Sequence, residues 1–231
     1  MKRFWREVTV ERTALGWEVA LDGRRLRTAR GVPQAVPTKA LAEALAEEWR
    51  AQGETVDPAG FVLRDLADYA IDVVGPDRDD AIERILKYGE SDTLCYRAEP
   101  DEPLAARQRE VWEPLLKACE DVHGVRFVRA TGVLHRLQPE ATLARLRARL
   151  EALCPFQLAA LQTTASLAAS LVVGLAALEP GADAEALYAA ANLEQDWQAE
   201  LWGWDHEAEA RRARKLAEFA AAARFAALAR K

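Results

Sequence analysis

Residues 155–178 read PFQLAALQTTASLAASLVVGLAAL, a run without a single charged side chain. The run is long enough for a helix to cross a bilayer, but it contains glutamine, threonine and serine, and no basic cluster marks either end. A helix that is apolar on all sides is also typical of a protein core. We therefore expect a buried central helix, in which Ser166, Ser170 and Gly174 recur every four residues and allow another helix to approach closely. A membrane-associated scaffold is the alternative interpretation.

Helical patterns lie on both sides of this run, over nearly all of the chain after residue 38. Apolar residues recur there every three or four positions, and capping residues, glycine or proline mark the ends. The expected helices span residues 38–52, 63–74, 77–89, 103–119, 139–153, 183–202 and 205–230.

The first forty residues instead alternate with period two, which indicates strands with one buried face. Trp17, Val19 and Leu21 share one such face, and Asp22-Gly23 is a tight-hairpin signal. The predicted fold is therefore α+β and mostly α. We expect a small antiparallel β-rich N-terminal domain with one helix over residues 1–60, followed by an all-helical domain over residues 61–231.

Composition excludes several classes of protein. The 231 residues carry a net charge of −6, which lacks the basic surface that nucleic-acid binding requires. Three cysteines, an odd number, favour neither a disulfide framework nor a paired-cysteine zinc site. The N-terminal residues lack the apolar run of a signal peptide. We expect a cytoplasmic bacterial protein, or a protein of the mitochondrial matrix if the chain is a mature organellar one.

Local sequence also lacks the usual catalytic and cofactor motifs. The twelve glycines are at least seven residues apart, which excludes a phosphate-binding loop and a dinucleotide turn. The three histidines show no ligand spacing. We expect no enzyme activity, no cofactor, no metal site and no small-molecule substrate. The alternative is an enzyme whose site is assembled by the fold, using Cys95 or a carboxylate.

Aromatic and acidic residues concentrate near the C-terminus. Trp197, Trp202 and Trp204 lie within eight residues, among several carboxylates. Helical spacing places Glu194 at the margin of an apolar face formed by Leu193, Trp197 and Leu201. A carboxylate there needs a partner. One interpretation is an internal arginine or lysine, and the other is a site that recognises another protein, since tryptophan beside a carboxylate is typical of binding hot spots.

Four segments in register resemble one protein family over essentially the whole chain. They are residues 2–5 (KRFW) with 21–24 (LDGR), residues 48–54 (EWRAQGE), residues 92–97 (DTLCYR), and residues 193–198 (LEQDWQ) with 202–203 (WG). In order and spacing the chain resembles the Atp-twelve family, the chaperones that assemble the catalytic sector of F-type ATP synthase.

The resemblance implies a β-rich N-terminal domain, a helical domain and a chaperone function. It implies binding of the free α subunit of ATP synthase, the client, and shielding of its interface until the β subunit replaces the chaperone. The family's acidic position falls on Glu194, and four further client-binding candidates are its neighbours: Asp196, Trp197, Gln198 and Trp202. Trp49 matches the family's tryptophan on the first helix, where we expect a packing role between the domains.

Overall fold

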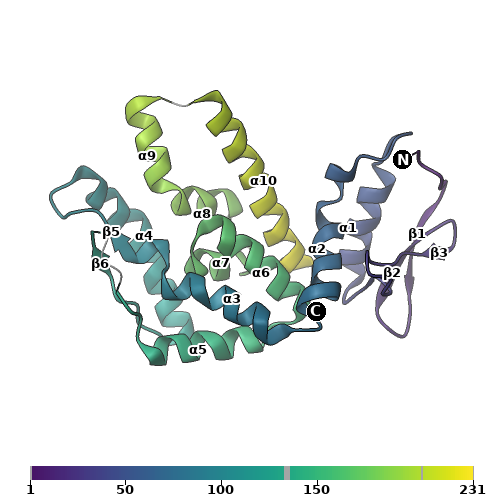
Figure 1. Ribbon diagram of the computed structural model, residues 1–231, viewed down its shortest axis with the longest axis horizontal. Helices are drawn as coiled ribbons and strands as arrows, with labels where there is room; N and C mark the ends of the chain where they lie inside the picture. The colour runs from purple at the N-terminus through teal and green to yellow at the C-terminus, as the bar shows by residue number, and fades with distance from the viewer. Residues whose placement is uncertain (1, 133–135, 204, 231) are drawn as a thin grey trace.

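A small sheet lies at one end of the molecule, and helices form the rest of it (Figure 1). The computed structural model describes residues 2–132, 136–203 and 205–230. This arrangement confirms the α+β, mostly α, fold expected from the change of period near residue 38.

The sheet contains four short strands, and the predicted Asp22-Gly23 hairpin joins the second strand to the third. The strands are β1 (Val8–Arg12), β2 (Trp17–Leu21), β3 (Arg24–Arg25) and β4 (Ala35–Val36). β2 pairs antiparallel with the other three. Asp22 and Gly23 both adopt positive φ, 48° and 77°. This is the backbone conformation that the Asp-Gly signal predicts for a two-residue turn.

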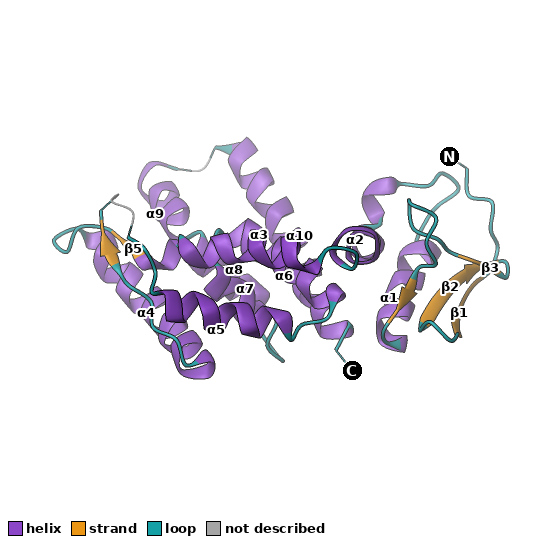
Figure 2. Ribbon diagram, turned by 60° about the horizontal axis from the view of Figure 1, so that its bottom comes forward, coloured by secondary structure: helices purple, strands orange, loops and turns teal. Residues whose placement is uncertain are grey.

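Helix α1 (Lys39–Arg50) covers this sheet. Figure 2 shows it directly beside the strands. The Thr38 hydroxyl accepts the backbone N–H of Leu41 at 3.1 Å and so caps the helix, as the sequence predicts. Its apolar side faces β1 and β2 and includes the fully buried Leu41 and Leu45.

The remaining helices form the larger body. They are α2 (Val62–Tyr69), continued by the π-helical turn η2 (Ala70–Val74), α3 (Arg78–Glu90), α4 (Pro103–His123), α5 (Glu140–Glu151), α6 (Pro155–Ala168), α7 (Leu171–Ala177), α8 (Ala184–Ala191), α9 (Leu193–Trp202) and α10 (His206–Leu228). Short 3-10 turns lie at η1 (Pro58–Gly60) and η3 (Thr93–Cys95). β5 (Tyr96–Arg97) and β6 (Ala130–Thr131) form a small parallel pair within this part of the chain.

The uncharged run forms the centre of the body, where α6 packs against α3, α7, α10 and η2. Its burial is as expected, but the expectation of one continuous helix is wrong. Ala169 adopts a left-handed conformation with φ 47°, and Ser170 then caps α7 by accepting the N–H of Val173. Gly174 of α7 lies so close to α6 that a Cβ would come within 3.1 Å of Ala165. In the described part of the chain, no helix is long and apolar enough to span a membrane.

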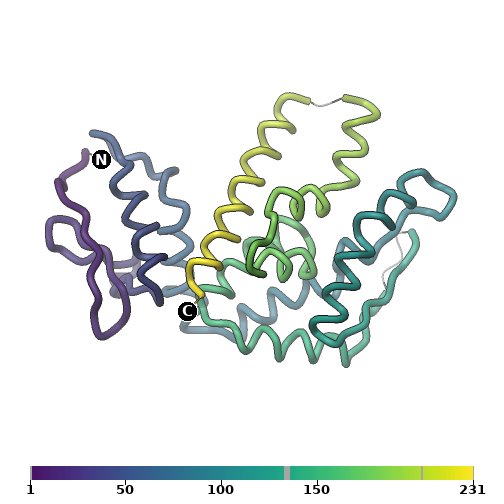
Figure 3. Tube along the Cα trace, turned by 180° about the vertical axis from the view of Figure 1, so that it is seen from behind, coloured from purple at the N-terminus to yellow at the C-terminus, as the bar shows by residue number. Residues whose placement is uncertain are grey.

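A second break divides the predicted helix over residues 183–202. α8 ends at Ala191. The next residue, Asn192, has a ψ of 18°, which lies outside the helical range, and α9 then starts in a new direction. α9 extends away from the body, and the chain then runs back along α10 (Figure 3). The break therefore places α9 at the periphery, with Leu193 buried and Leu201 58% exposed.

Polar contacts connect the sheet layer to the helical body. Thr28 donates a hydrogen bond to Asp72 at 2.7 Å, and Gln34 donates one to Asp68 at 2.5 Å. At the start of α1, the Thr38 hydroxyl donates a hydrogen bond to the carbonyl of Leu228, at the end of α10, at 2.5 Å. These contacts cross the predicted division at residue 60, which stays a prediction.

Candidate functional site

Glu194 lies in the first turn of α9 and is exposed, with one defined partner on α4. The side-chain amide of Gln108 donates a hydrogen bond to its Oε1 at 2.6 Å. Glu194 takes part in none of the ion pairs found among the described residues. The internal partner is thus an amide rather than the arginine or lysine considered from sequence.

The orientation of the Gln108 amide is fixed by its own surroundings. Gln108 is fully buried, and its Oε1 accepts the backbone N–H of Ala98 at 2.8 Å. A backbone N–H can only donate, so the amide oxygen must face Ala98, and the amide nitrogen must face Glu194. Gln108 therefore holds Oε1 of Glu194 in place, while the other carboxylate oxygen has no hydrogen-bond partner among the described residues.

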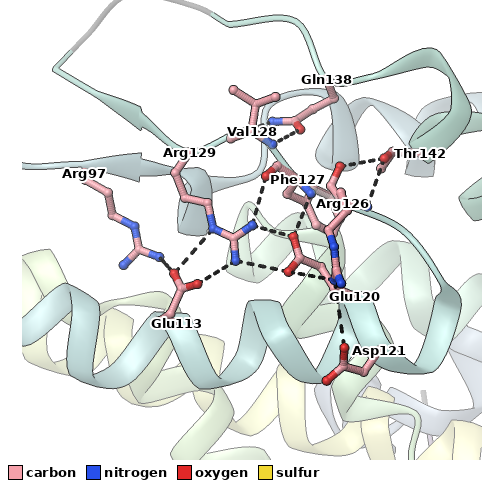
Figure 4. Close-up of polar contacts among 10 residues, drawn as sticks. All are labelled: Arg97, Glu113, Glu120, Asp121, Arg126, Phe127, Val128, Arg129, Gln138 and Thr142. Carbon is pink, nitrogen blue, oxygen red and sulfur yellow. Dashed lines mark hydrogen bonds and ion pairs between the residues drawn. The ribbon is translucent and has the colours of Figure 1, made fainter.

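A network of charges holds the extended segments beside α4 (Figure 4). Arg129 forms ion pairs with both Glu113 and Glu120 of α4. Arg97 bonds to Glu113 at 3.2 Å and also donates to the carbonyl of Gln108 at 2.8 Å. The segment that runs from β5 to Ala98 is therefore fixed against the helix that carries Gln108.

Two further contacts join α9 to α4. The guanidinium of Arg107 forms a bidentate pair with Glu200, with N···O distances of 2.6 and 2.9 Å. These hydrogen bonds lower the pKa of Glu200 below its ordinary value. The same guanidinium lies 5.4 Å from the ring centroid of Trp197. Trp197 is half-buried by this stacking, which places it at the α4–α9 contact.

The opposite side of α9 faces α10. Asp196 forms a bidentate ion pair with Arg212 at 2.7 and 2.5 Å, so its charge is neutralised within the chain. Gln198 and Trp202 line a cavity of about 420 Å³ between the two helices, and Trp202 is 78% exposed. Trp204, the third tryptophan of the sequence cluster, lies outside the described residues.

Trp49 is far from α9 and packs inside the N-terminal part of the molecule. Its ring lies 5.0 Å from that of Trp5 in an edge-to-face arrangement and 4.5 Å from that of Phe61. The side chain is buried. These contacts connect residues on both sides of position 60, and the packing role of Trp49 between the domains stays a prediction.

Cys95 has the surroundings of a packing residue. Burial, with a further contribution from Asp92, raises the pKa of its thiol to about 12. The thiol is therefore protonated at neutral pH, whereas a nucleophilic cysteine acts as its thiolate. Within the described ranges no cluster of three or more His, Cys, Asp or Glu side chains could hold a metal ion.

Sequence reasoning missed Gln108, and a signal for it exists. Gln108, Trp112 and Leu116 lie four residues apart on the buried side of α4, and all three are fully buried. A glutamine in an apolar stripe must have polar partners. What the pattern cannot supply is the identity of those partners, since Glu194 is 86 positions away.

The helical body presents an exposed helix with an oriented carboxylate and an exposed tryptophan, and such side chains are typical of the class of proteins that bind another polypeptide. Comparison with known proteins identifies the family. Residues 2–120 match the model of the ATP12 chaperone protein family. The chain belongs to the ATP12 chaperone family and is thus an assembly chaperone of ATP synthase.

Individual relatives agree with this assignment. The chain is 27% identical over 214 residues to the mitochondrial protein atp12 of Schizosaccharomyces pombe, covering 87% of this chain and 74% of that protein. Atp12 from Paracoccus denitrificans has a solved structure with 38% identity and a TM-score of 0.94, and the match covers 99% of this chain and 98% of that one. The Agrobacterium tumefaciens protein Atu1473 matches with 40% identity and a TM-score of 0.93, over 97% of this chain and 85% of that one.

Proposed function

We propose that this chaperone binds the unassembled α subunit of the ATP synthase catalytic sector through α9 and shields its interface until the β subunit takes its place. An unassembled subunit exposes an apolar surface that otherwise aggregates. A protein that covers this surface temporarily must bind specifically and remain displaceable.

The observation that carries the proposal is the exposed Glu194 carboxylate held by a buried amide. A carboxylate fixed in one position loses little side-chain entropy when a partner binds it. Leu201 and Trp202, 58% and 78% exposed, supply apolar contact area at the other end of the same helix. We assign the central client contact to Glu194 and peripheral contacts to Gln198 and Trp202.

Two of the sequence candidates have other roles in this proposal. Asp196 holds α9 against α10 through Arg212, and Trp197 holds α9 against α4 through Arg107. Both orient α9, and they act on the client through the position of that helix. Trp49 supports the fold.

The direct test is co-purification with isolated α and β subunits, each added separately. We expect a complex with α and not with β, and suppression of α aggregation measured by light scattering. Adding β to the preformed complex is expected to release the chaperone. A chaperone that binds β in preference to α, or that leaves α aggregation unchanged, contradicts the proposal.

A further inference from the structure

The cavity between α9 and α10 combines an exposed aromatic ring with basic side chains. Its walls are formed by Gln198 and Trp202 of α9 and by Arg211 and Lys215 of α10, and its volume is about 420 Å³. Side-chain amides of α9 add hydrogen-bond donors and acceptors to one wall. We call this cavity the α9–α10 cleft.

The charges of the cleft are unbalanced. Three basic side chains line it, Arg211, Arg212 and Lys215, of which Arg212 is neutralised by Asp196. Arg211 and Lys215 lie one turn apart on the same side of α10, and neither takes part in the ion pairs found among the described residues. Asp205 also lines the cleft, and its carboxylate caps α10 by accepting the N–H of Ala208 at 3.3 Å.

Two like charges one turn apart destabilise a helix slightly. Here they stand on a chain with a net charge of −6, so the local excess of positive charge is a feature of this cleft rather than of the whole surface. Arginine and lysine at a concave site are suited to binding carboxylates, arginine through two parallel hydrogen bonds.

We propose that the α9–α10 cleft binds an acidic segment of the client polypeptide, with its carboxylates at Arg211 and Lys215 and an apolar side chain against Trp202. This inference depends on the proposed function and extends it, because it places a second contact of opposite charge beside Glu194. α9 then lies between two client contacts: Glu194 on the side of α4 and the cleft on the side of α10.

The test uses the full chain with both cleft charges reversed, Arg211→Glu with Lys215→Glu. Glutamate forms helices about as well as arginine or lysine, so α10 is expected to persist. Arg224→Glu is the matched control, because Arg224 is an exposed arginine of α10 that does not line the cleft. Circular dichroism and thermal unfolding check the fold of each variant, and the isolated α and β subunits are the binding probes.

We expect the double variant to bind α at least about tenfold more weakly than the wild type, and its affinity to depend less on salt. Arg224→Glu should bind like the wild type. If Glu194→Gln weakens α binding while the cleft variant does not, the cleft proposal is overturned and the proposed function stands. If the wild type binds β instead, with the same dependence on Arg211 and Lys215, the cleft stands and the choice of α is wrong.

Two more results would overturn the cleft proposal. One is a variant with Arg211→Gln and Lys215→Gln that binds α with wild-type affinity and wild-type salt dependence. The other is binding of single-stranded RNA to the wild type that is lost on charge reversal, which would assign these cations to a phosphate backbone. If the wild type binds neither subunit, the proposed function and the cleft are both rejected.

Discussion

Replacing Glu194 with glutamine separates binding from folding. Glu194→Gln keeps the size and shape of the side chain and removes its charge. The amide oxygen of the new residue can still accept the hydrogen bond that Gln108 donates at 2.6 Å. The bond changes from charge-assisted to neutral, a net difference of about 1 kcal/mol in stability. Since the side chain is exposed, we expect the free energy of unfolding to fall by no more than this.

The effect on client binding should be larger. Removing one member of a charged, hydrogen-bonded contact that is buried in an interface costs about 2 to 5 kcal/mol of binding free energy. At about 1.4 kcal/mol per factor of ten, the lower value corresponds to roughly a 30-fold rise in Kd. Isothermal titration calorimetry with the isolated α subunit measures this change, and urea unfolding measures stability.

Glu200→Gln is the matched control on the same helix. It removes an exposed carboxylate that is already paired with Arg107, and an exposed ion pair contributes only about 0 to 1 kcal/mol. The new amide oxygen can still accept a hydrogen bond from Arg107, so α9 is expected to keep its position. We expect little change in α binding. The reasoning is refuted if Glu194→Gln and Glu200→Gln weaken binding equally. It is also refuted if Glu194→Gln lowers the free energy of unfolding by about 3 kcal/mol or more, because Glu194 would then be a structural residue.

Three other predictions concern stability and orientation. Gln108→Leu leaves the N–H of Ala98 without its acceptor, so we expect a loss of about 1 to 3 kcal/mol in urea unfolding, together with weaker α binding because Glu194 is no longer held. Trp49→Ala should cost about 3 to 5 kcal/mol, whereas Trp49→Phe should cost much less because the indole N–H has no hydrogen-bond partner in the described structure; equal losses in urea unfolding would contradict the packing role. Burial raises the pKa of Asp92 from 3.8 to about 6, so between these pH values the folded state binds a proton that the unfolded state does not. Lowering the pH from 7 to 4 should therefore stabilise the wild type relative to Asp92→Asn by up to about 3 kcal/mol. Urea unfolding at both pH values measures this, and a free energy of unfolding that falls for the wild type relative to Asp92→Asn would contradict it.

The sequence predicts those parts of the fold that depend on local signals. The two-residue turn requires positive φ at both positions, and few residue pairs other than Asp-Gly adopt that conformation easily. The residues Asp22-Gly23 alone therefore predict the hairpin. Thr38 and Asp183 cap α1 and α8 at the expected positions because capping uses side chains within three residues of the helix start.

The break between α6 and α7 depends on tertiary contacts. Ala169 is neither glycine nor proline, yet it adopts a left-handed conformation. Its carbonyl accepts hydrogen bonds from both the N–H and the hydroxyl of Thr93, 76 positions away. Asp92, beside Thr93, accepts the N–H of Val172 at the start of α7. The segment over residues 92–97, which the family resemblance includes, therefore determines where the central run breaks, and a local pattern cannot contain that information.

The same distinction applies to the candidate site. Helical spacing correctly indicates that Glu194 lies near the margin of an apolar stripe, but spacing assumes that the helix continues from α8. Because the chain turns at Asn192, the stripe leaves the body along α9, and its last member, Leu201, is exposed rather than buried. The internal partner of Glu194, Gln108, is 86 positions away on α4, so spacing along α9 cannot reveal it, and an outside partner stays a prediction.

The contacts that hold α9 explain how a small protein can keep large apolar side chains of this helix exposed without losing its structure. Arg107 on α4 and Arg212 on α10 bond to Glu200 and Asp196, which lie four residues apart on α9. Each of these ion pairs spans two helices, so α9 is held from both sides by polar bonds and need not bury its apolar residues to stay in place. The exposed Leu201 and Trp202 are then available to a client. A contact that combines a modest apolar area with charges at its rim forms quickly and specifically without extreme affinity, which is the combination that release to an incoming subunit requires.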